Sequence, residues 1–295
     1  MRYVVAGVGY TGRRVLAALP ADLALGLSRS LPPESGPGGS TSKANMQLLD
    51  LDRPADPPPA DLLQDLQPCT VVYTIPPRAD GDDDKRLALF LSLLGARPER
   101  IVYLSTSGVY GDRQGRLTDE SVTPRPQTDR ARRRLAAETM LGAWCEQHGV
   151  ELTVLRVPGI YGPGRLGLSR LRAGGEVLRK VDAGPGNRIH VDDLKRCCLA
   201  AMHPDSPAGL YNVGDGDARS SGEFSATVAK LAGLPAPAEI TLAQARREWS
   251  PARLSFIEES RQLDLTRMTD VLGVSPLYAN VEDGIRASLD EEAAP

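Results

Sequence analysis

The chain has 295 residues, of which 41% are hydrophobic and 25% charged, with a formal net charge of −3. The near balance of charge gives no basic surface for nucleic acid, and no apolar stretch is long enough to span a bilayer, so neither partner is expected. No signal peptide precedes the first apolar run, and the four cysteines lack CxxC spacing, which favours free thiols in a reducing cytoplasm. The three histidines are scattered, so no metal site is expected.

The first predicted element is a short buried strand over residues 3–6, and a helix over 13–19 follows it closely. The connecting loop has the pattern GxGxxG and contains the candidate phosphate-contacting residues Gly7, Gly9, Tyr10, Thr11 and Gly12. The first glycine permits a tight turn, the second lets the backbone approach a pyrophosphate, and the third lets the helix pack on the strand. Free N–H groups at the start of the helix favour phosphate. An ordinary glycine-rich turn is the alternative interpretation.

Strands and helices then alternate, which predicts a parallel sheet covered on both faces. Further strands are predicted at residues 23–28, 46–51, 70–75, 101–106 and 152–157. Proline-rich loops are expected over 31–43 and 53–59, with helices near 60–66, from 82–84 to about 95, over 128–147 and from a capping box at 220–223 to 234. The long helix is expected to bury Leu135, Thr139, Met140, Ala143 and Trp144.

The end of the second strand bears on the choice of nucleotide. An acidic residue there often binds the ribose 2′-hydroxyl of NAD, but this strand ends in Ser28, Arg29 and Ser30. The arginine fork, helped by the two hydroxyls, suits a 2′-phosphate, so we expect NADP rather than NAD. A solvated loop arginine is the alternative. Asp50, with Leu51 beside it, or Asp52 could accept from the adenine amino group, or both carboxylates could be solvated.

Five segments together resemble one family. They lie at residues 7–12, 103–112, 156–164, 188–194 and 210–214, in the order and spacing of that family. The chain thereby resembles the extended short-chain dehydrogenase/reductase superfamily, in its sugar-nucleotide epimerase/dehydratase branch, and looks like the atypical NAD-dependent epimerase/dehydratase-like proteins. The resemblance implies an α/β fold with a Rossmann-type doubly wound parallel sheet and a small C-terminal substrate lobe. The dinucleotide-binding domain would take residues 1–158, 187–204 and 280–293, and the lobe 159–186 and 205–279.

The resemblance also implies roles for particular residues. Thr106 matches the catalytic Ser/Thr whose hydroxyl binds the reacting oxygen of the substrate. The remaining cofactor positions would be Thr74, Ile75, Pro76, Ser105 and Pro158. The substrate positions would be Ser107, Tyr161 and Arg188, the last where relatives grip a nucleotide-sugar phosphate. Asp192 and Asp193 are expected to cap the helix over 194–202.

The chain departs from the family pattern at the Tyr-x-x-x-Lys pair. Arg130 stands at the tyrosine position and Arg134 at the lysine position, four residues apart on one helix face. Guanidinium does not deprotonate in proteins, so Arg130 cannot be a general acid or base, although it could stabilise an oxyanion or grip an anionic substrate. A solvated basic face is the alternative. Tyr110 or Tyr161 could replace the acid, although packing is the simpler role for Tyr110.

Two functions follow as hypotheses. The first is an NADP-dependent oxidoreductase or epimerase acting by hydride transfer on a small polar or nucleotide-sugar-like molecule. The second is a non-catalytic NADP-binding sensor or partner subunit, suggested by the glycine loop without the Tyr-Lys pair. A homodimer is possible, because relatives often pair through the helix carrying Arg130 and the helix before it.

Overall fold

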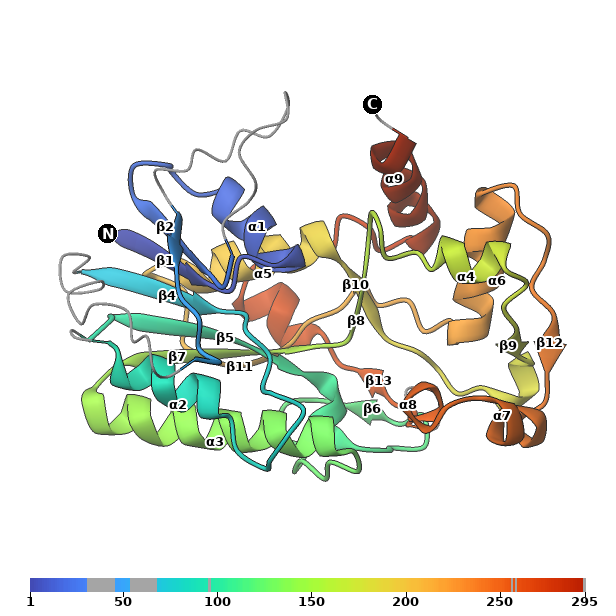
Figure 1. Cartoon of the computed structure of the whole chain (residues 1–295), viewed down its shortest axis with the longest axis horizontal. Coiled ribbons are helices and arrows are strands. Elements are labelled where there is room, and N and C mark those ends of the chain that lie inside the picture. Colours follow the sequence, from blue (N-terminus) through green and yellow to red (C-terminus); the bar gives the residue numbers. More distant parts are fainter. Residues whose placement is uncertain (31–45, 54–67, 95–96, 256, 258, 294–295) are drawn as a thin grey trace. The chain divides into compact units, whose positions relative to one another are not determined.

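The computed structural model describes residues 1–30, 46–53, 68–94, 97–255, 257 and 259–293, and it divides into two compact units (Figure 1). The first unit comprises Met1–Thr106, Asp129–Arg156 and Lys195–Tyr211. The second comprises Ser107–Thr128, Val157–Leu194 and Asn212–Pro295. The domains predicted from the sequence are defined by which part binds cofactor and which binds substrate. The two compact units are defined by packing alone, so they do not test that prediction.

A seven-stranded sheet forms the first unit, in the order β3-β2-β1-β4-β5-β7-β11. The strands are β1 (Arg2–Ala6), β2 (Ala24–Ser28), β3 (Met46–Leu48), β4 (Cys69–Tyr73), β5 (Arg100–Thr106), β7 (Glu151–Val157) and β11 (Gly209–Asn212). The pairs β1–β2, β2–β3, β1–β4 and β4–β5 are parallel. This order is that of a doubly wound sheet, which confirms the predicted fold class. The order reverses between β1 and β4, and ligands bind such folds at the carboxyl ends of these strands.

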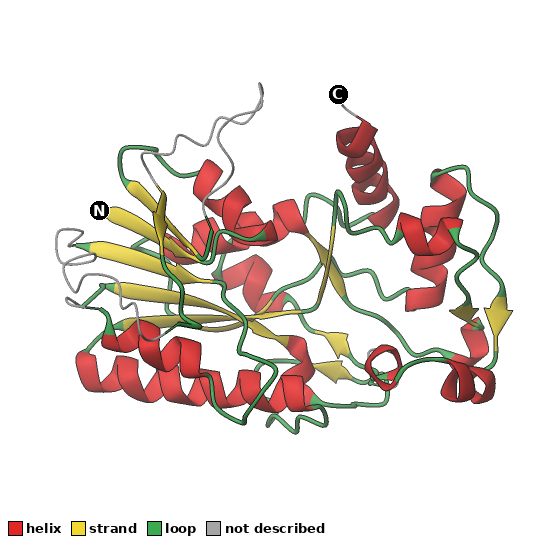
Figure 2. Cartoon of the chain, in the orientation of Figure 1, coloured by secondary structure: helices red, strands yellow, loops and turns green. Residues whose placement is uncertain are grey.

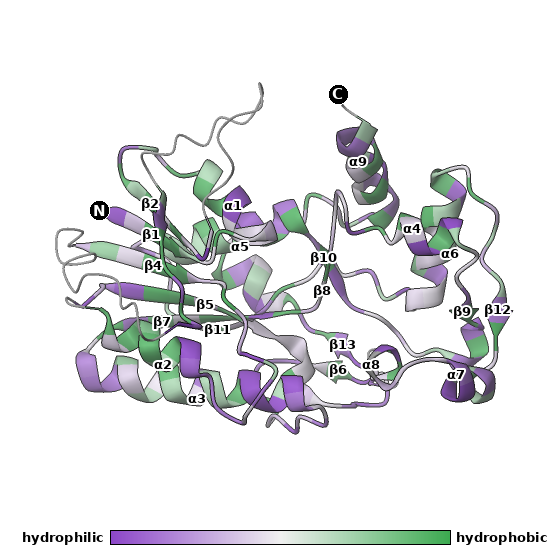
Figure 3. Ribbon diagram, in the orientation of Figure 1, coloured by the Kyte–Doolittle hydropathy of each residue, from purple (hydrophilic) through white to green (hydrophobic). Residues whose placement is uncertain are grey.

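Helices cover both faces of this sheet (Figures 1 and 2). Helices α1 (Tyr10–Ala17) and α5 (Val191–Met202) lie on one face, and α2 (Lys85–Ser92) and α3 (Asp129–His148) on the other. The central strands β1 and β4 are apolar along almost their whole length, as strands buried on both faces must be. In Figure 3 both α2 and α3 carry hydrophilic as well as hydrophobic bands, as expected of helices with one face in water.

The face that α3 buries differs from the one predicted. The structure buries Ala137, Leu141 and Cys145 against the core, with Met140 and Trp144 only partly buried. Thr139 and Ala143, both assigned to the apolar face, are exposed. The helix is thus rotated so that Ala137, Leu141 and Cys145 face the core, and Met140 and Trp144 pack at its edge.

Most other predicted elements are found within a few residues of their expected bounds. The third strand ends at Leu48 rather than at residue 51, although Leu49 and Leu51 are still buried. Asp84 caps α2, accepting from the Leu87 N–H at 3.0 Å. The loop predicted over 31–43 lies outside the described residues, as do the helix near 60–66 and most of the loop over 53–59.

A buried arginine ties distant segments of the first unit together. The guanidinium of Arg100, in β5, donates to the carbonyl oxygens of Ala201, in the last turn of α5, and of His203, Pro204 and Ser206, just beyond it. It also pairs with Glu151 in β7. Carbonyl groups at a helix end lack intrahelical partners. The Arg100 side chain supplies hydrogen-bond donors to these carbonyl oxygens, which would otherwise need water.

The second unit combines short helices with three two-stranded parallel sheets, β8–β10, β9–β12 and β6–β13. Its strands are β6 (Leu117–Thr118), β8 (Gly159–Tyr161), β9 (Val177–Leu178), β10 (Arg188–His190), β12 (Glu239–Ile240) and β13 (Gln262–Leu263). Its helices are α4 (Leu168–Arg172), α6 (Ser221–Leu231), α7 (Leu242–Glu248), α8 (Pro251–Leu254) and α9 (Val281–Ala293), with shorter turns at Ser107–Tyr110, Lys180–Asp182 and Arg267–Val271. The predicted capping box opens α6, where Ser220 and Glu223 bond reciprocally.

The start of α5 corrects one prediction. The helix begins at Val191, so Asp192 and Asp193 lie in its first turn rather than before it. The carboxylate of Asp193 accepts instead from the backbone N–H groups of Leu277 and Tyr278, at 2.8 and 3.1 Å.

Among the described helices, none is long and apolar enough to cross a membrane.

Candidate functional site

The glycine loop after β1 is shaped by backbone contacts that exclude side chains. Gly7 has φ +99°, and a Cβ there would lie 2.6 Å from Thr74 Oγ1. A Cβ on Gly12 would lie 2.0 Å from the carbonyl oxygen of Gly7, which sets how closely α1 approaches the strand end. Thr74, just past β4, donates its hydroxyl to that same oxygen at 2.6 Å. The loop therefore joins the carboxyl ends of β1 and β4, where the strand order reverses.

Gly9 differs from Gly7 and Gly12 because the space that a side chain would occupy is empty. A Cβ on Gly9 would meet no atom within 4 Å, so packing within the chain does not require glycine there. Gly9 is the N-cap of α1, makes no side-chain capping bond, and the first turn of α1 has no acidic residue. This helix end thus keeps its partial positive charge for an anion. Thr11 is buried and Tyr10 half-buried against Arg14. The loop fits a dinucleotide pyrophosphate.

Three arginines converge on one carboxylate beside the carboxyl ends of β2, β3 and β4. Arg86 binds Asp52 with Nε at 2.7 Å and a terminal nitrogen at 2.6 Å, and Arg78 lies 3.2 Å away. Arg29 is 3.4 Å from the same carboxylate, and its side chain is 71% exposed. The hydrogen bonds and charges of Arg86 and Arg78 lower the pKa of Asp52 to about 2. Both oxygens of Asp52 therefore already accept hydrogen bonds, and the three arginines carry more positive charge than this one carboxylate neutralises.

The other candidate cofactor residues lie around this cluster and the glycine loop. Ser28 is half-buried and Ser30 exposed at the end of β2. Asp50 accepts from the Asp52 N–H at 2.9 Å and pairs with Arg53 at 3.6 Å, while Leu51 is buried. Ile75 packs on the core, and the carbonyl oxygen of Pro76 accepts from Arg86 at 2.9 Å. Asp50 is thus already engaged with its own loop.

The end of β5 rests on a buried ion pair. Ser105 donates its hydroxyl to Glu138 in α3, and Arg156 in β7 binds the same carboxylate at 2.7 and 3.2 Å. The side chains of Glu138 and Arg156 are only 10% and 5% exposed. Thr106, the next residue, is half-buried where the strand ends. The pair holds β5, α3 and β7 in one arrangement and so fixes the strand end that presents Thr106.

The two arginines that replace the expected Tyr-Lys pair have different surroundings. Arg130 is exposed in the first turn of α3. Arg134 is partly buried and donates to the Leu104 carbonyl oxygen at 2.7 Å and to the Tyr103 hydroxyl at 3.2 Å. Its guanidinium carbon also lies 5.7 Å from the Tyr103 ring centre. Arg134 therefore serves partly as a brace between α3 and β5.

The candidate residues of the second unit are mostly buried. Tyr110 donates its hydroxyl to Asn212 at 2.7 Å, and Ser107 is buried in the turn before it. Tyr161 belongs to an apolar core, and its hydroxyl has no hydrogen-bond partner among the residues that the structure describes. Burial raises the pKa of Tyr161 far above its ordinary range. Pro158 is half-buried. Both tyrosines are buried, so neither presents its hydroxyl at a surface.

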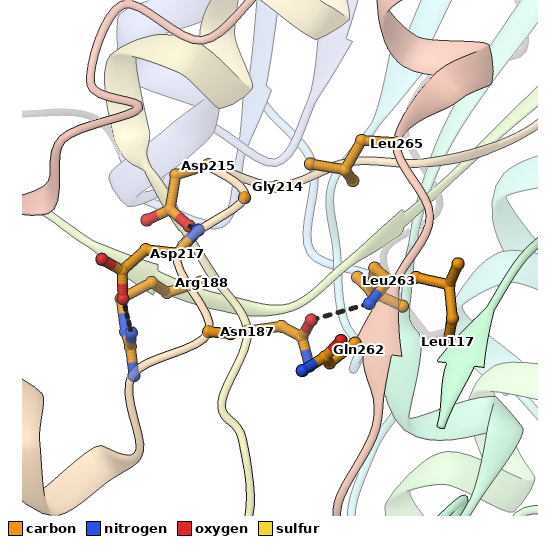
Figure 4. A pocket seen from close by; sticks show the side chains of 11 residues that line it. Leu117, Asn187, Arg188, Gly214, Asp215, Asp217, Gln262, Leu263 and Leu265 are labelled. Carbon is orange, nitrogen blue, oxygen red and sulfur yellow. Dashed lines mark hydrogen bonds and ion pairs between the residues drawn. The ribbon is translucent and has the colours of Figure 1, made fainter. Parts of the chain in front are cut away.

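Arg188 is also buried, and its terminal nitrogens are engaged within its own unit. One binds Asp217 at 3.2 Å, and the other donates to the carbonyl oxygens of Arg219 and Ser220 at 2.7 and 3.4 Å. Its guanidinium carbon lies 4.6 Å from the ring centre of Phe224. Figure 4 shows the ion pair of Arg188 and Asp217 on one wall of a pocket. The volume of this pocket is about 200 Å³.

Sequence reasoning missed several of these residues. Arg78, Arg86, Asp215 and Asp217 were not among the candidates. Arg78, Asp215 and Asp217 follow the ends of β4 and β11 within five residues, whereas Arg86 lies in α2. Arg78 and Arg86 are 26 and 34 residues from Asp52 in the sequence, so their proximity to it depends on the tertiary fold. Asp215 and Asp217 follow Gly214, which ends a segment that resembles the family. Their negative charge next to that segment was the sequence feature that could have identified them.

Comparisons with known proteins relate part of this chain to one family. Residues 84–214 match the NAD dependent epimerase/dehydratase family. The UDP-glucose 4-epimerase of Mycolicibacterium smegmatis is 28% identical over 209 residues, which cover 67% of this chain and 63% of that enzyme. The chain spans 50 to 63% of the length of the first curated relatives it matches.

Solved structures extend the similarity along the chain. A functionally unknown conserved protein from Silicibacter pomeroyi has a TM-score of 0.81 and 29% identity, covering 99% of both chains. A UDP-glucuronic acid 4-epimerase from Bacillus cereus, solved in complex with NAD, has a TM-score of 0.76 over 98% of both chains. At 18% identity, the latter shows a shared fold.

Proposed function

Because the chain belongs to the NAD-dependent epimerase/dehydratase family of extended short-chain dehydrogenases/reductases, we propose that it binds NADP and uses it for hydride transfer on a small polar substrate. One observation carries the choice of NADP over NAD: Arg29, Arg78 and Arg86 gather at the strand ends where the adenosine ribose lies in such folds. NADP carries a 2′-phosphate at that ribose, and guanidinium groups bind phosphate with paired N–H donors.

The carboxylate at this position does not favour NAD. Asp52 lies after β3 rather than at the end of β2, and both its oxygens already accept from arginines. A ribose 2′-hydroxyl would have to compete with charged donors for those oxygens. Arg29 makes the longest of the three contacts and has the most exposed side chain of the three, so it can turn toward a phosphate at the least cost.

Replacing Arg29 with alanine tests the choice of cofactor. We expect the Kd for NADP to rise about 10- to 100-fold, because a hydrogen bond to a charged group contributes about 1.5 to 3 kcal/mol. The Kd for NAD should change little. Titration calorimetry with both nucleotides measures the two constants, and Arg53→Ala, which removes another exposed arginine nearby, is the matched control. Equal losses for NADP and NAD, or tighter wild-type binding of NAD, would contradict NADP selection.

Two side chains, those of Thr106 and Arg130, take part in the proposed reaction. When bound, the nicotinamide ring donates or accepts the hydride. Thr106 donates its hydroxyl hydrogen bond to the substrate oxygen on which negative charge develops as a carbonyl is reduced. Arg130, exposed on α3, stabilises the same charge or binds an anionic substrate group. Since guanidinium keeps its protons, the proton that completes the alcohol comes from water.

The variant Thr106→Val removes the proposed hydrogen-bond donor while keeping the branched shape. We expect turnover with NADPH to fall by a factor of about 100 or more, whereas the Kd for NADPH stays within about twofold. A panel of aldehydes, ketones and nucleotide-sugars, followed by NADPH absorbance, supplies the assay. Turnover equal to that of the wild type would exclude this role for Thr106.

A non-catalytic NADP-binding sensor or partner subunit is the second candidate. The surroundings of Arg134 favour it, because one terminal nitrogen of this side chain is committed to β5 through the Leu104 carbonyl oxygen and the Tyr103 hydroxyl. The same panel separates the candidates. Oxidation of NADPH by any member supports the enzyme, whereas tight NADPH binding without turnover on the whole panel supports the sensor.

A further inference from the structure

The three arginines that gather at Asp52 differ in how many of their donors are already used. Arg86 binds the two oxygens of Asp52 through Nε, at 2.7 Å, and one terminal nitrogen, at 2.6 Å. Its other terminal nitrogen donates to the Pro76 carbonyl oxygen at 2.9 Å. The side chain of Arg86 is also only 18% exposed. All three of its guanidinium nitrogens therefore have partners within the fold, and Arg86 acts as an anchor for Asp52.

Arg78 and Arg29 keep donors for a ligand. Arg78 donates through Nε to Asp80 at 2.7 Å and through one terminal nitrogen to Asp52 at 3.2 Å. Arg29 donates to Asp52 through one terminal nitrogen at 3.4 Å, and this is its one hydrogen bond to a residue that the structure describes. The two side chains are 40% and 71% exposed. Both thus retain N–H groups that no described residue binds, in contrast to Arg86.

Asp52 joins these two side chains to the anchor. Arg29 follows β2 and Arg78 follows β4, the two strands that flank β1 in the sheet. Two guanidinium groups held at one carboxylate repel each other, and the charge of that carboxylate offsets the repulsion. Without Asp52, both the repulsion and the conformational entropy of exposed arginine side chains would favour their separation.

We propose that Asp52 is a positioning residue for the cofactor: fixed by Arg86, it holds Arg29 and Arg78 together at one position, where both bind the 2′-phosphate of NADP. The inference rests on the proposed function and adds different roles for the three arginines, because Arg29 and Arg78 contact the phosphate and Arg86 does not. A phosphate group has several strong acceptor oxygens, so it can accept paired hydrogen bonds from two guanidinium groups at once.

The loss of Asp52 should have an effect opposite in sign to that of its charge. By charge alone, removing a carboxylate near a phosphate removes repulsion and tightens binding. If Asp52 holds the arginines together, its removal weakens the binding of the phosphate instead. Asp80 offers the matched control, because it pairs with Arg78 at 2.7 Å and no described contact joins it to Arg29 or Arg86. Asp80→Asn therefore removes the same charge without separating the arginines.

Two nucleotides that differ only in the 2′-phosphate, adenosine 2′,5′-bisphosphate and adenosine 5′-monophosphate, test the proposal by titration calorimetry on the full chain. The wild type should bind the bisphosphate about tenfold or more tightly than the monophosphate, because hydrogen bonds between charged groups are strong. Asp52→Asn should reduce this ratio to about twofold or less, whereas Asp80→Asn should keep or increase it. An unchanged Kd for the monophosphate shows that the variant site is folded.

The possible failures have different meanings. A wild type with no preference for the bisphosphate would overturn NADP selection, and the role of Asp52 with it. A preference in the wild type that Asp52→Asn keeps or increases would overturn the role of Asp52 alone. Neither result depends on catalysis, because the probes contain no nicotinamide.

A double-mutant cycle tests whether Arg86 acts through Asp52. Arg86→Lys keeps the positive charge but loses the paired donors that fix the carboxylate. It should lower the preference for the bisphosphate in the wild type and have no further effect in Asp52→Asn protein, where the contact is already lost. Additive effects of the two substitutions would show that Arg86 binds the phosphate itself. Either additivity or a wild-type preference in Arg86→Lys protein would refute the proposal.

Discussion

Replacing Gly9 with alanine will abolish nucleotide binding while leaving the free protein as stable as the wild type. The new Cβ has no neighbour within 4 Å, and the backbone at φ −85° accepts alanine without strain. The methyl group would instead occupy the space through which a pyrophosphate approaches the start of α1. NADP at about 100 times its Kd should stabilise the wild type by about 2.7 kcal/mol, and Gly9→Ala protein should lose this gain.

Thermal unfolding with and without NADP measures both effects. The matched variant is Gly12→Ala, whose Cβ would lie 2.0 Å from the Gly7 carbonyl oxygen, so the strand and helix would have to separate. That variant should lower the stability of the free protein by several kcal/mol or prevent folding. If Gly9→Ala protein keeps the stabilisation by NADP, the loop is only a structural turn.

Removing Glu138 will have the largest effect on stability among single side chains near the candidate active site. Its carboxylate binds Arg156 and Ser105 in the interior, so Glu138→Ala leaves a buried guanidinium without its counter-charge. Breaking one partner of a buried pair costs about 3 to 5 kcal/mol. Urea unfolding of the free protein should show a loss of this size.

Two further variants separate the pair from other causes. Glu146→Ala, at an exposed position on the same helix, should change the free energy of unfolding by less than about 0.5 kcal/mol. The double variant Glu138→Leu/Arg156→Met replaces both charges by apolar groups and should recover much of the lost stability. A small effect of Glu138→Ala, or no recovery in the double variant, would show that the pair does not hold the strand end.

The sequence was sufficient for features set by short-range pattern. The strand, glycine loop and helix at the start of the chain follow from local apolar runs and from the spacing of the glycines between them. The capping box at Ser220 is equally local. Patterns of this kind specify backbone geometry within a few residues, so they survive whatever tertiary contacts form later.

Features that depend on distant segments were not predictable in the same way. The buried face of α3 depends on which side of the helix meets the sheet, and that side includes Ala137, Leu141 and Cys145. Asp193 looked like a helix cap but accepts from Leu277 and Tyr278, more than 80 residues away. The arginines around Asp52 come together only because the segments after β2 and β4 and the first turn of α2 meet beside the segment after β3. Charge in a sequence identifies such residues without indicating which of them will pair.

The contacts of Arg100 have a consequence for synthesis of the protein. Its carbonyl acceptors lie between residues 201 and 206, and β11 ends at Asn212, so the first unit needs chain made long after its first five central strands. A nascent chain ending near residue 158 would hold the Arg100 guanidinium without those acceptors and the sheet without its last strand. The first unit can therefore be completed during synthesis only after the whole segment between residues 157 and 194, which belongs to the other unit, has been made.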